Sequence, residues 1–208
     1  SDLAGASAGL TVKASGYIIC TSTNNTTYSG SLSASIVSGD TIIIAKNTGY
    51  GSYTYGTDTI NGGTPTYHIS NRAWSSPLYS HFRIMSRVAT ASASSVSWSC
   101  NEGSNNRAAM ICYCWVVSGG VSYEDSSSVY GNGATMTVDT GGPALIIGTA
   151  YTWRQYSMPI WGSGADYGSD CDRDYHVSTG WALQTDSSST YSMTVTRTGS
   201  ANRVTSFT

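Results

Sequence analysis

The sequence predicts an all-β protein, a two-sheet antiparallel β-sandwich of jelly-roll type, and three observations lead to this prediction. Apolar residues alternate with polar ones or form short continuous runs, and no stretch keeps the 3.6-residue period of an amphipathic helix. Glycine-rich turns separate these runs at the short intervals typical of sandwiches. The chain has 23 glycines and 15 tyrosines but only 11% charged residues, a composition that indicates a rigid β scaffold presenting aromatic rings with polar tips.

Three alternating segments predict half-buried strands. Segments 96–100 and 191–196 place every second residue on an apolar face. In segment 81–88 the alternation predicts two faces, with Phe82, Ile84 and Val88 inward and His81, Arg83 and Arg87 outward.

Three continuous apolar runs predict central strands that are covered on both faces: Thr41–Ala45, Ala108–Val117 and Ala144–Ile147. Together with the alternating segments they predict one core. Its expected members are Ile42, Ile44, Phe82, Ile84, Trp98, Ile111, Leu145, Ile147 and Val195.

Turn sequences such as Ser38-Gly39-Asp40 and Gly141-Gly142-Pro143 punctuate the runs. The turn at 198–202 predicts a terminal hairpin between 191–197 and 203–207. We find no sequence repeat and no linker, so the expectation is a single domain over residues 1–208, in which residues 1–9 form a flexible or subunit-contacting arm.

Charge and the N-terminal sequence bear on partners and location. The net charge is -2, the sequence pI is about 5.8, and the arginines form no basic stripe, which argues against nucleic acid as a partner. The first ten residues contain neither a basic start nor an apolar run. They therefore predict no signal peptide and no membrane insertion, and synthesis in a cytoplasm.

The cysteines predict reduced thiols, because their number is odd and their spacing fits no disulfide framework. They are Cys20, Cys100, Cys112, Cys114 and Cys171. Cys112 and Cys114 share one face of an expected strand and could begin a zinc site, but the C-x-x-C spacing is absent. Burial as small core residues is the favoured interpretation, and no metal is predicted.

The order of these segments resembles that of β-sandwich modules of bacteriophage virions. The resemblance rests on a Ser/Thr-rich strand, the run Ser38-Gly39-Asp40 before Thr41–Ile44, the alternating segment 81–85, a Trp-bearing strand, Gly141–Gly148 and a closing hairpin. It covers about Gly39 to Phe207 and is one of layout. It implies a location on the virion exterior, as a tail fibre, head fibre or decoration, with other virion proteins and copies of the same chain as partners.

Catalytic patterns are weak. The segment Gly5–Gly9 matches G-x-S-x-G, but the strand that a nucleophile elbow needs before it is missing. The histidines His68, His81 and His176 are isolated, and His81 is expected on a solvated face. The two glutamates, Glu102 and Glu124, lie in separate hydrophilic turns and form no glycosidase pair. We therefore predict a protein that is not an enzyme and has no cofactor.

The segment 151–168 is the predicted recognition loop. It contains two of the six tryptophans, and its proline and glycines argue against a regular strand. A flat aromatic ring beside polar groups suits a sugar ligand. A contact with a neighbouring subunit uses the same residue types. The alternative is that a tryptophan folds back and plugs one end of the sandwich. The predicted ligand- or subunit-binding residues are Tyr151, Trp153, Arg154, Tyr156, Trp161, Asp166 and Tyr167.

Asp170, Asp172 and Asp174 imitate the start of a calcium loop, but Tyr175 and Trp181 stand where Gly and Glu belong. An acidic edge strand that resists aggregation is the alternative interpretation.

Three classes of function remain open at this point. The first is a structural or attachment protein of a phage virion that contacts host-surface polysaccharide or neighbouring subunits. The second is a free-standing carbohydrate-binding module, and the third is a glycan-degrading enzyme. Assembly state would separate the first from the others.

Overall fold

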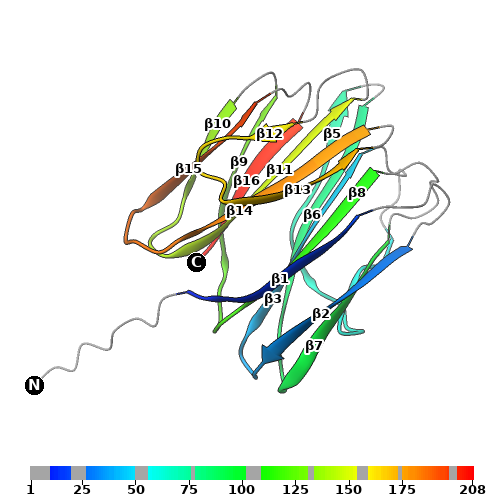
Figure 1. The fold of residues 1–208 in the computed structure, drawn as a ribbon, viewed down its shortest axis with the longest axis vertical. Coiled ribbons are helices and arrows are strands. Elements are labelled where there is room, and N and C mark those ends of the chain that lie inside the picture. Colours follow the sequence, from blue (N-terminus) through cyan, green and yellow to red (C-terminus); the bar gives the residue numbers. More distant parts are fainter. Residues whose placement is uncertain are drawn as a thin grey trace, which may run out of the picture.

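A computed structural model describes residues 10–19, 27–49, 56–75, 78–101, 109–130, 134–153, 159–172, 175–196 and 201–208. These residues form sixteen β-strands and no helix, and all of their strand pairs are antiparallel (Figure 1). The prediction of an all-β, antiparallel, sandwich-type fold is confirmed. None of the described segments is a helix long and apolar enough to cross a membrane.

The first eight strands fill the N-terminal half of the chain. They are β1 (Val12–Ile19), β2 (Thr27–Ile36), β3 (Thr41–Gly49), β4 (Thr59–Ile60), β5 (Thr66–Ser75), β6 (Leu78–Val88), β7 (Ala93–Asn101) and β8 (Ala109–Val117). They make a large sheet of order β1-β8-β3-β6-β5 and a small sheet of order β2-β7-β4.

The other eight strands fill the C-terminal half. They are β9 (Tyr123–Tyr130), β10 (Ala134–Asp139), β11 (Ala144–Trp153), β12 (Ile160–Trp161), β13 (Tyr167–Asp172), β14 (Tyr175–Gln184), β15 (Thr190–Thr196) and β16 (Ala201–Phe207). Their large sheet has the order β13-β14-β11-β16-β9 and their small sheet the order β10-β15-β12.

The two halves repeat one topology. Each strand of the first half has an equivalent in the second half whose number is higher by eight. The large sheet β1-β8-β3-β6-β5 then corresponds to β9-β16-β11-β14-β13, which is the large sheet of the second half read in the opposite direction, and the small sheet β2-β7-β4 corresponds to β10-β15-β12. In each half the first strand pairs with the eighth, the second with the seventh and the third with the sixth. This nested pairing is the jelly-roll arrangement, so the chain contains two jelly-roll-like sandwiches in tandem.

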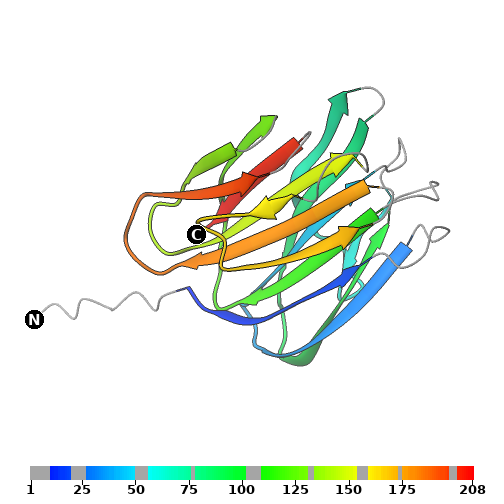
Figure 2. The same ribbon diagram turned by 45° about the horizontal axis from the view of Figure 1, so that its top comes forward.

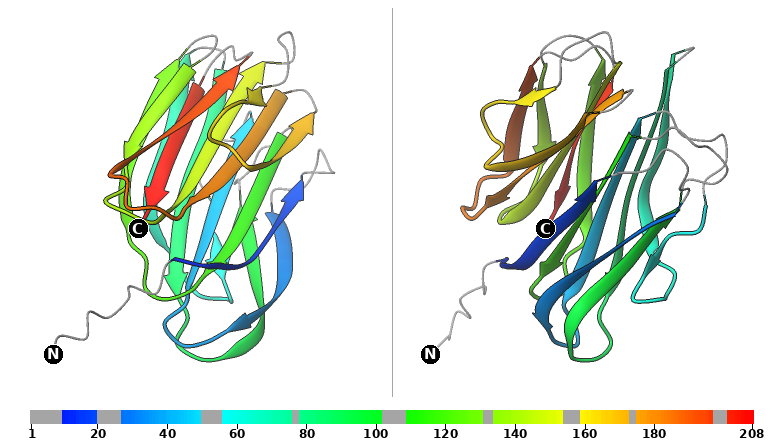
Figure 3. Two further views of the ribbon diagram at one scale, coloured as in Figure 1. Left: turned by 60° about the vertical axis from the view of Figure 1, so that its left-hand side comes forward. Right: turned by 45° about the vertical axis from the view of Figure 1, so that its right-hand side comes forward.

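The sandwiches stack through their large sheets. Strands β3 and β8 of the first half contact β11, β13 and β14 of the second. The result is four layers, small sheet, large sheet, large sheet and small sheet, and the right-hand view of Figure 3 shows the two halves as two adjoining stacks of strands. Each large sheet is therefore covered on both faces.

Strand β11 shows how one strand serves two cores. Its odd-numbered residues Leu145, Ile147 and Tyr151 belong to the larger hydrophobic cluster, which continues into the first half. Its even-numbered residues Ala144, Ile146 and Ala150 belong to a second cluster inside the second half. The period of two in a strand produces this division, and it explains the apolar run at 144–147.

Strands β3 and β8 are likewise buried along their described lengths, which confirms the prediction of central strands covered on both faces. A polar contact also joins the halves, because the Nδ2 group of Asn47 donates hydrogen bonds to the carbonyl oxygens of Ala150 and Ser178, both at 3.0 Å.

All nine residues predicted for the core are buried, but they do not share one core. Eight lie in the larger cluster, whereas Val195 lies in the second cluster because β15 belongs to the outer sheet of the second half.

Two predictions about individual strands are wrong. The terminal hairpin does not form between the described strands, because β15 pairs with β10 and β12 while β16 pairs with β11 and β9. In β6, Arg83 is buried rather than outward, and Val88 at the strand end is 50% exposed. Arg83 is buried because β6 lies inside a sheet that is covered on both faces, so the face that the alternation assigned to solvent also packs into a core.

Asp40 connects three segments of the first half through hydrogen bonds to its carboxylate. Its carboxylate accepts a hydrogen bond from the Lys13 ammonium group at 2.6 Å and from the N–H groups of Val37 at 2.8 Å and Gly119 at 3.4 Å. Burial alone would raise the pKa of Asp40, but these donors outweigh burial and the pKa lies below its usual value.

Truncation of Leu145 should test the packing between the halves. Leu145→Ala removes a fully buried side chain from the shared cluster and should lower the free energy of unfolding by about 2–5 kcal/mol. Urea unfolding monitored by circular dichroism measures this change. Ile160→Ala, at an exposed position, is the control and should change stability by less than about 0.5 kcal/mol; equal effects of the two variants would contradict the stacking of the halves.

The Asp40 network predicts a loss of stability in acid. Because the folded pKa is depressed, the contribution is complete above the usual aspartate pKa of about 3.8 and is lost as the pH falls through the folded pKa. Asp40→Asn should therefore be less stable than the unmodified chain at neutral pH, and the difference should shrink as the pH falls below this value. Unfolding midpoints measured across the acid range test this, and a difference that stays constant with pH would refute it.

Candidate recognition surface

The predicted recognition loop begins later than the sequence indicated. Strand β11 continues to Trp153 because Thr152 and Trp153 still pair with His176 and Tyr175 of β14. Tyr151 is therefore part of a central strand and is only 2% exposed. The prediction that Tyr151 contributes to a binding surface is wrong, since its ring faces the shared core.

Three of the predicted residues cannot be placed on a surface. Arg154 and Tyr156 lie outside the described residues, and of Trp153 only the backbone, at the end of β11, is described. Their assignment as binding residues stays a prediction.

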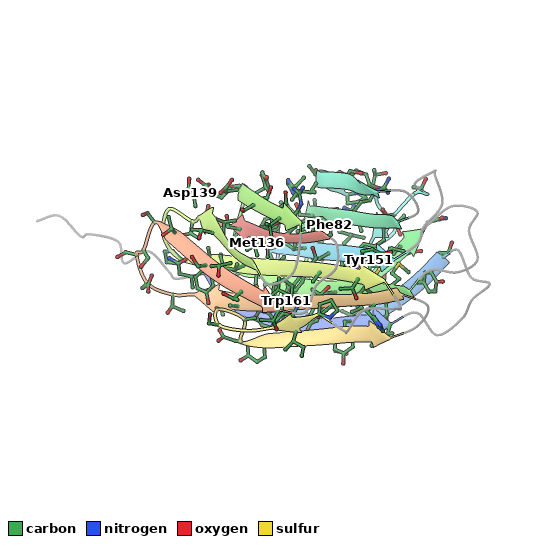
Figure 4. All side chains as sticks on the ribbon, turned by 90° about the horizontal axis from the view of Figure 1, so that it is seen from above. Phe82, Met136, Asp139, Tyr151 and Trp161 are labelled. Atoms are coloured by element: carbon green, nitrogen blue, oxygen red, sulfur yellow. The ribbon has the colours of Figure 1, made fainter. Side chains whose placement is uncertain are left out.

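Trp161 folds back onto its own half. A Cβ atom added at Gly148 would lie 2.5 Å from its Cη2 atom, and one added at Gly180 would lie 2.8 Å from its Cγ atom. Its Nε1 group donates a hydrogen bond to Ser178 Oγ at 3.0 Å. Figure 4 shows Trp161 lying against the strands of the second half, and the two glycines, a cross-strand pair of β11 and β14, provide the flat surface on which the indole rests. This is the plug alternative that the sequence left open.

Asp166 and Tyr167 reach the surface. Asp166 is exposed, and its N–H group donates to the carbonyl oxygen of Trp181 at 3.1 Å. Tyr167 begins the edge strand β13 and is 58% exposed. Its ring stacks on the ring of Trp181 with a centroid distance of 4.5 Å and an interplanar angle of 24°.

Tyr167 is one end of a five-ring group that crosses from the second half to the first. We call it the seam cluster; its members are Tyr17, Tyr113, Trp115, Tyr167 and Trp181. Trp181 meets Trp115 edge to face at 6.1 Å, and Trp115 stacks on Tyr113 at 4.6 Å. At the other end Tyr17 of β1 tilts over Tyr113 at 5.2 Å and is 48% exposed.

The seam cluster lies where the two large sheets end on the same side of the molecule. Figure 2 shows β14, β13, β8 and β1 following one another at this side, and contacts between β13 and β8 agree with that order. The Trp181 Nε1 group donates a hydrogen bond to Tyr113 Oη at 3.1 Å across the seam. Burial raises the pKa of Tyr113, although the N–H donor acts in the opposite direction, so this hydroxyl remains protonated at neutral pH.

A second aromatic contact closes the opposite side of the large sheets. His68 of β5 stacks on Tyr123 of β9 at 5.7 Å and meets Phe207 edge to face at 5.4 Å. Its Nε2 atom is 2.7 Å from Ser86 Oγ, and burial lowers the pKa of His68. Since His68 is only partly exposed and hydrogen-bonded, it acts here as a packing residue.

Three charged residues of the first half, Asp58, Lys46 and Arg83, form a buried cluster rather than an accessible site. Asp58 accepts hydrogen bonds from Lys46 Nζ at 3.0 Å, Arg83 NH1 at 2.6 Å and the N–H group of Asn101 at 2.8 Å. The side chains of Lys46 and Asp58 are fully buried. With its oxygens engaged in this way, Asp58 is the partner of two buried cations.

The described residues include no group of three or more His, Cys, Asp or Glu side chains that could hold a metal ion. Cys112 and Cys114 are buried and free, as is Cys100, and burial raises the pKa of Cys112 and Cys114. Asp170 and Asp172 lie on the edge strand β13, while their side chains and all of Asp174 fall outside the described part of the chain. The calcium hypothesis therefore stays untested.

Sequence reasoning missed four members of the seam cluster. Tyr113 and Trp115 lie inside a run that the sequence marks as a central strand. Trp181 lies in a segment that the sequence assigned to no strand, and Tyr17 lies in a segment with no clear alternation. What unites them is the pairing of distant strands, which no local pattern reports. The abundance of tyrosine was the one available signal.

Comparison with known proteins gives no assignment, because no family model, no curated protein and no solved structure matches this chain.

The packing of Trp161 yields a direct test. Gly180→Ala or Gly148→Ala should displace the indole and lower the free energy of unfolding by about 1–3 kcal/mol, the usual effect of overpacking. Gly120→Ala is the matched control because a Cβ atom there meets no heavy atom within 4 Å. Thermal unfolding of the three variants measures the effect. If all three behave alike, Trp161 does not rest on these glycines in solution.

Proposed function

We propose that this protein is a non-enzymatic structural and attachment protein on the exterior of a bacteriophage virion, where it contacts host-surface glycans or neighbouring virion subunits. The observation that carries the proposal is the seam cluster, whose two terminal tyrosines are about half exposed and are each backed by a buried ring. Exposed aromatic rings held in place by packing concentrate binding energy in recognition surfaces.

The fold is in keeping with this role. Jelly-roll sandwiches occur in viral capsid proteins and in lectin domains, so two of them in tandem suit a protein that builds or decorates a particle. The fold alone does not assign a function. The sequence layout, which resembles that of phage virion modules, is what adds the virion to the proposal, and the seam cluster adds recognition.

A free-standing carbohydrate-binding module is the second candidate, because the same exposed tyrosines suit it equally well. The two candidates differ in assembly. A virion protein is bound to a particle, whereas a free-standing module is found apart from it.

Locating the protein tests the proposal first. Antibodies against the chain should label intact phage particles in electron micrographs, and the chain should co-purify with them. Absence from the particle, with the protein recovered as a free monomer, would favour the carbohydrate-binding module.

The second test changes the surface. Particles carrying both Tyr17→Ala and Tyr167→Ala should attach to host cells, or incorporate the protein, at least about tenfold less well, because truncated hot-spot residues typically remove more than 1–2 kcal/mol of binding. Tyr67→Ala removes an exposed tyrosine ring from β5, at the other edge of its sheet, and is the matched control. Attachment and incorporation that both remain at the unmodified level would contradict the assignment of the seam cluster as the recognition surface.

A further inference from the structure

The seam cluster is built from both halves of the chain. Tyr17 lies on β1, the edge strand of the first large sheet, and Tyr167 lies on β13, the edge strand of the second. Both rings are about half exposed, while Tyr113, Trp115 and Trp181 between them are buried. The surface therefore offers two exposed aromatic faces, one from each half, on a shared base.

The two exposed rings are held rigidly. Tyr167 stacks almost parallel on Trp181, and the Trp181 indole is itself fixed by its hydrogen bond to Tyr113. Tyr17 in turn rests on the Tyr113 ring. Little side-chain freedom is left to lose on binding, and this lowers the entropic cost of association.

Charge at the seam disfavours an anionic ligand. Asp166, next to Tyr167, is exposed and carries a negative charge. On β1 the one basic residue, Lys13, is engaged with Asp40. Like charges repel an acidic polymer, so an uncharged ligand fits the site better.

The exposed apolar area also disfavours a second protein chain. A stable interface buries about 800 Å² on each partner. At this edge the large exposed apolar side chains of the described residues are Tyr17 and Tyr167, whereas the others lie on other strands or turns, at Val37, Tyr67, Val88 and Ile160. Two separate exposed tyrosine rings instead match a glycan chain, because each ring can pack against the C–H face of one sugar unit.

We propose that the seam between the two halves binds an uncharged glycan chain, with Tyr17 and Tyr167 each stacking on a pyranose ring. This inference rests on the proposed recognition function and names its ligand class. Because the ligand contacts both halves, binding favours their docked state and raises the unfolding temperature of the whole chain.

Affinity electrophoresis of the purified chain tests the inference. Native gels contain one soluble uncharged polysaccharide each, a glucan, a galactan or a mannan, and alginate serves as the anionic comparison. We expect at least one uncharged polymer, and not alginate, to retard the protein. Tyr17→Ala and Tyr167→Ala should each weaken that binding by about tenfold or more, whereas Tyr17→Phe and Tyr167→Phe keep the ring and should retain it.

Controls keep the result interpretable. Tyr67→Ala should bind like the unmodified chain, and thermal unfolding of every variant shows whether it is folded. If an alanine variant fails to fold, the phenylalanine variant and the ligand-induced rise in unfolding temperature of the unmodified chain decide the question. No retardation by any uncharged polymer, or retardation unaffected by the alanine variants, overturns the inference.

The outcomes separate this inference from the proposed function. If the alanine variants lose particle incorporation or attachment while the purified chain binds no uncharged polysaccharide, the glycan inference is wrong and the recognition function stands. If the purified chain binds a glycan through Tyr17 and Tyr167 but is absent from particles, the glycan inference stands and the virion assignment is wrong.

Discussion

The packing of one large sheet against the other is the constraint on which the rest of this structure depends. It gives central strands two buried faces, so that strands such as β3, β8, β11 and β14 must satisfy an inner and an outer core at once. Apolar runs such as 42–45 and 144–147 are the consequence. Asn47 is a polar side chain that finds partners in this interior, because it donates hydrogen bonds to two carbonyl oxygens of the other half.

The two halves solve the same packing problem with different chemistry. Next to the short strand β4, the first half places an ion cluster in which Asp58 joins Lys46 of β3 and Arg83 of β6. In the equivalent strand β12 of the second half, Trp161 places its indole on Gly148 and Gly180. Lys46 and Arg83 are cross-strand partners, and so are the two glycines. Repeated topology with such different contents explains why no repeat can be read in the sequence.

Local patterns predicted the strands and most of the core, because periodicity and turn chemistry act over a few residues. The alternation at Val96, Trp98 and Cys100 is an example, since all three are buried. The same patterns failed for Arg83, which the alternation placed on an outer face although it is buried. They also failed for the terminal hairpin, since jelly-roll wrapping sends successive strands to different sheets. Tyr167 was predicted as a surface residue, and it is exposed. Tyr17 and Trp181 were not connected to it, because their proximity depends on strand pairing between distant segments.

The nested pairing also sets an order of events during synthesis. Strand β1 remains an unpaired edge until β8 has emerged, since Val12 pairs with Val117. When the first half is then complete, Trp115 and its neighbours on the large sheet have no second sheet to cover them until β11, β13 and β14 follow. The nascent chain thus passes through a stage with a bare apolar sheet face, and long-range pairing of this kind is slow. The interval between completion of the two halves is therefore the stage at which a chaperone would have most apolar surface to cover.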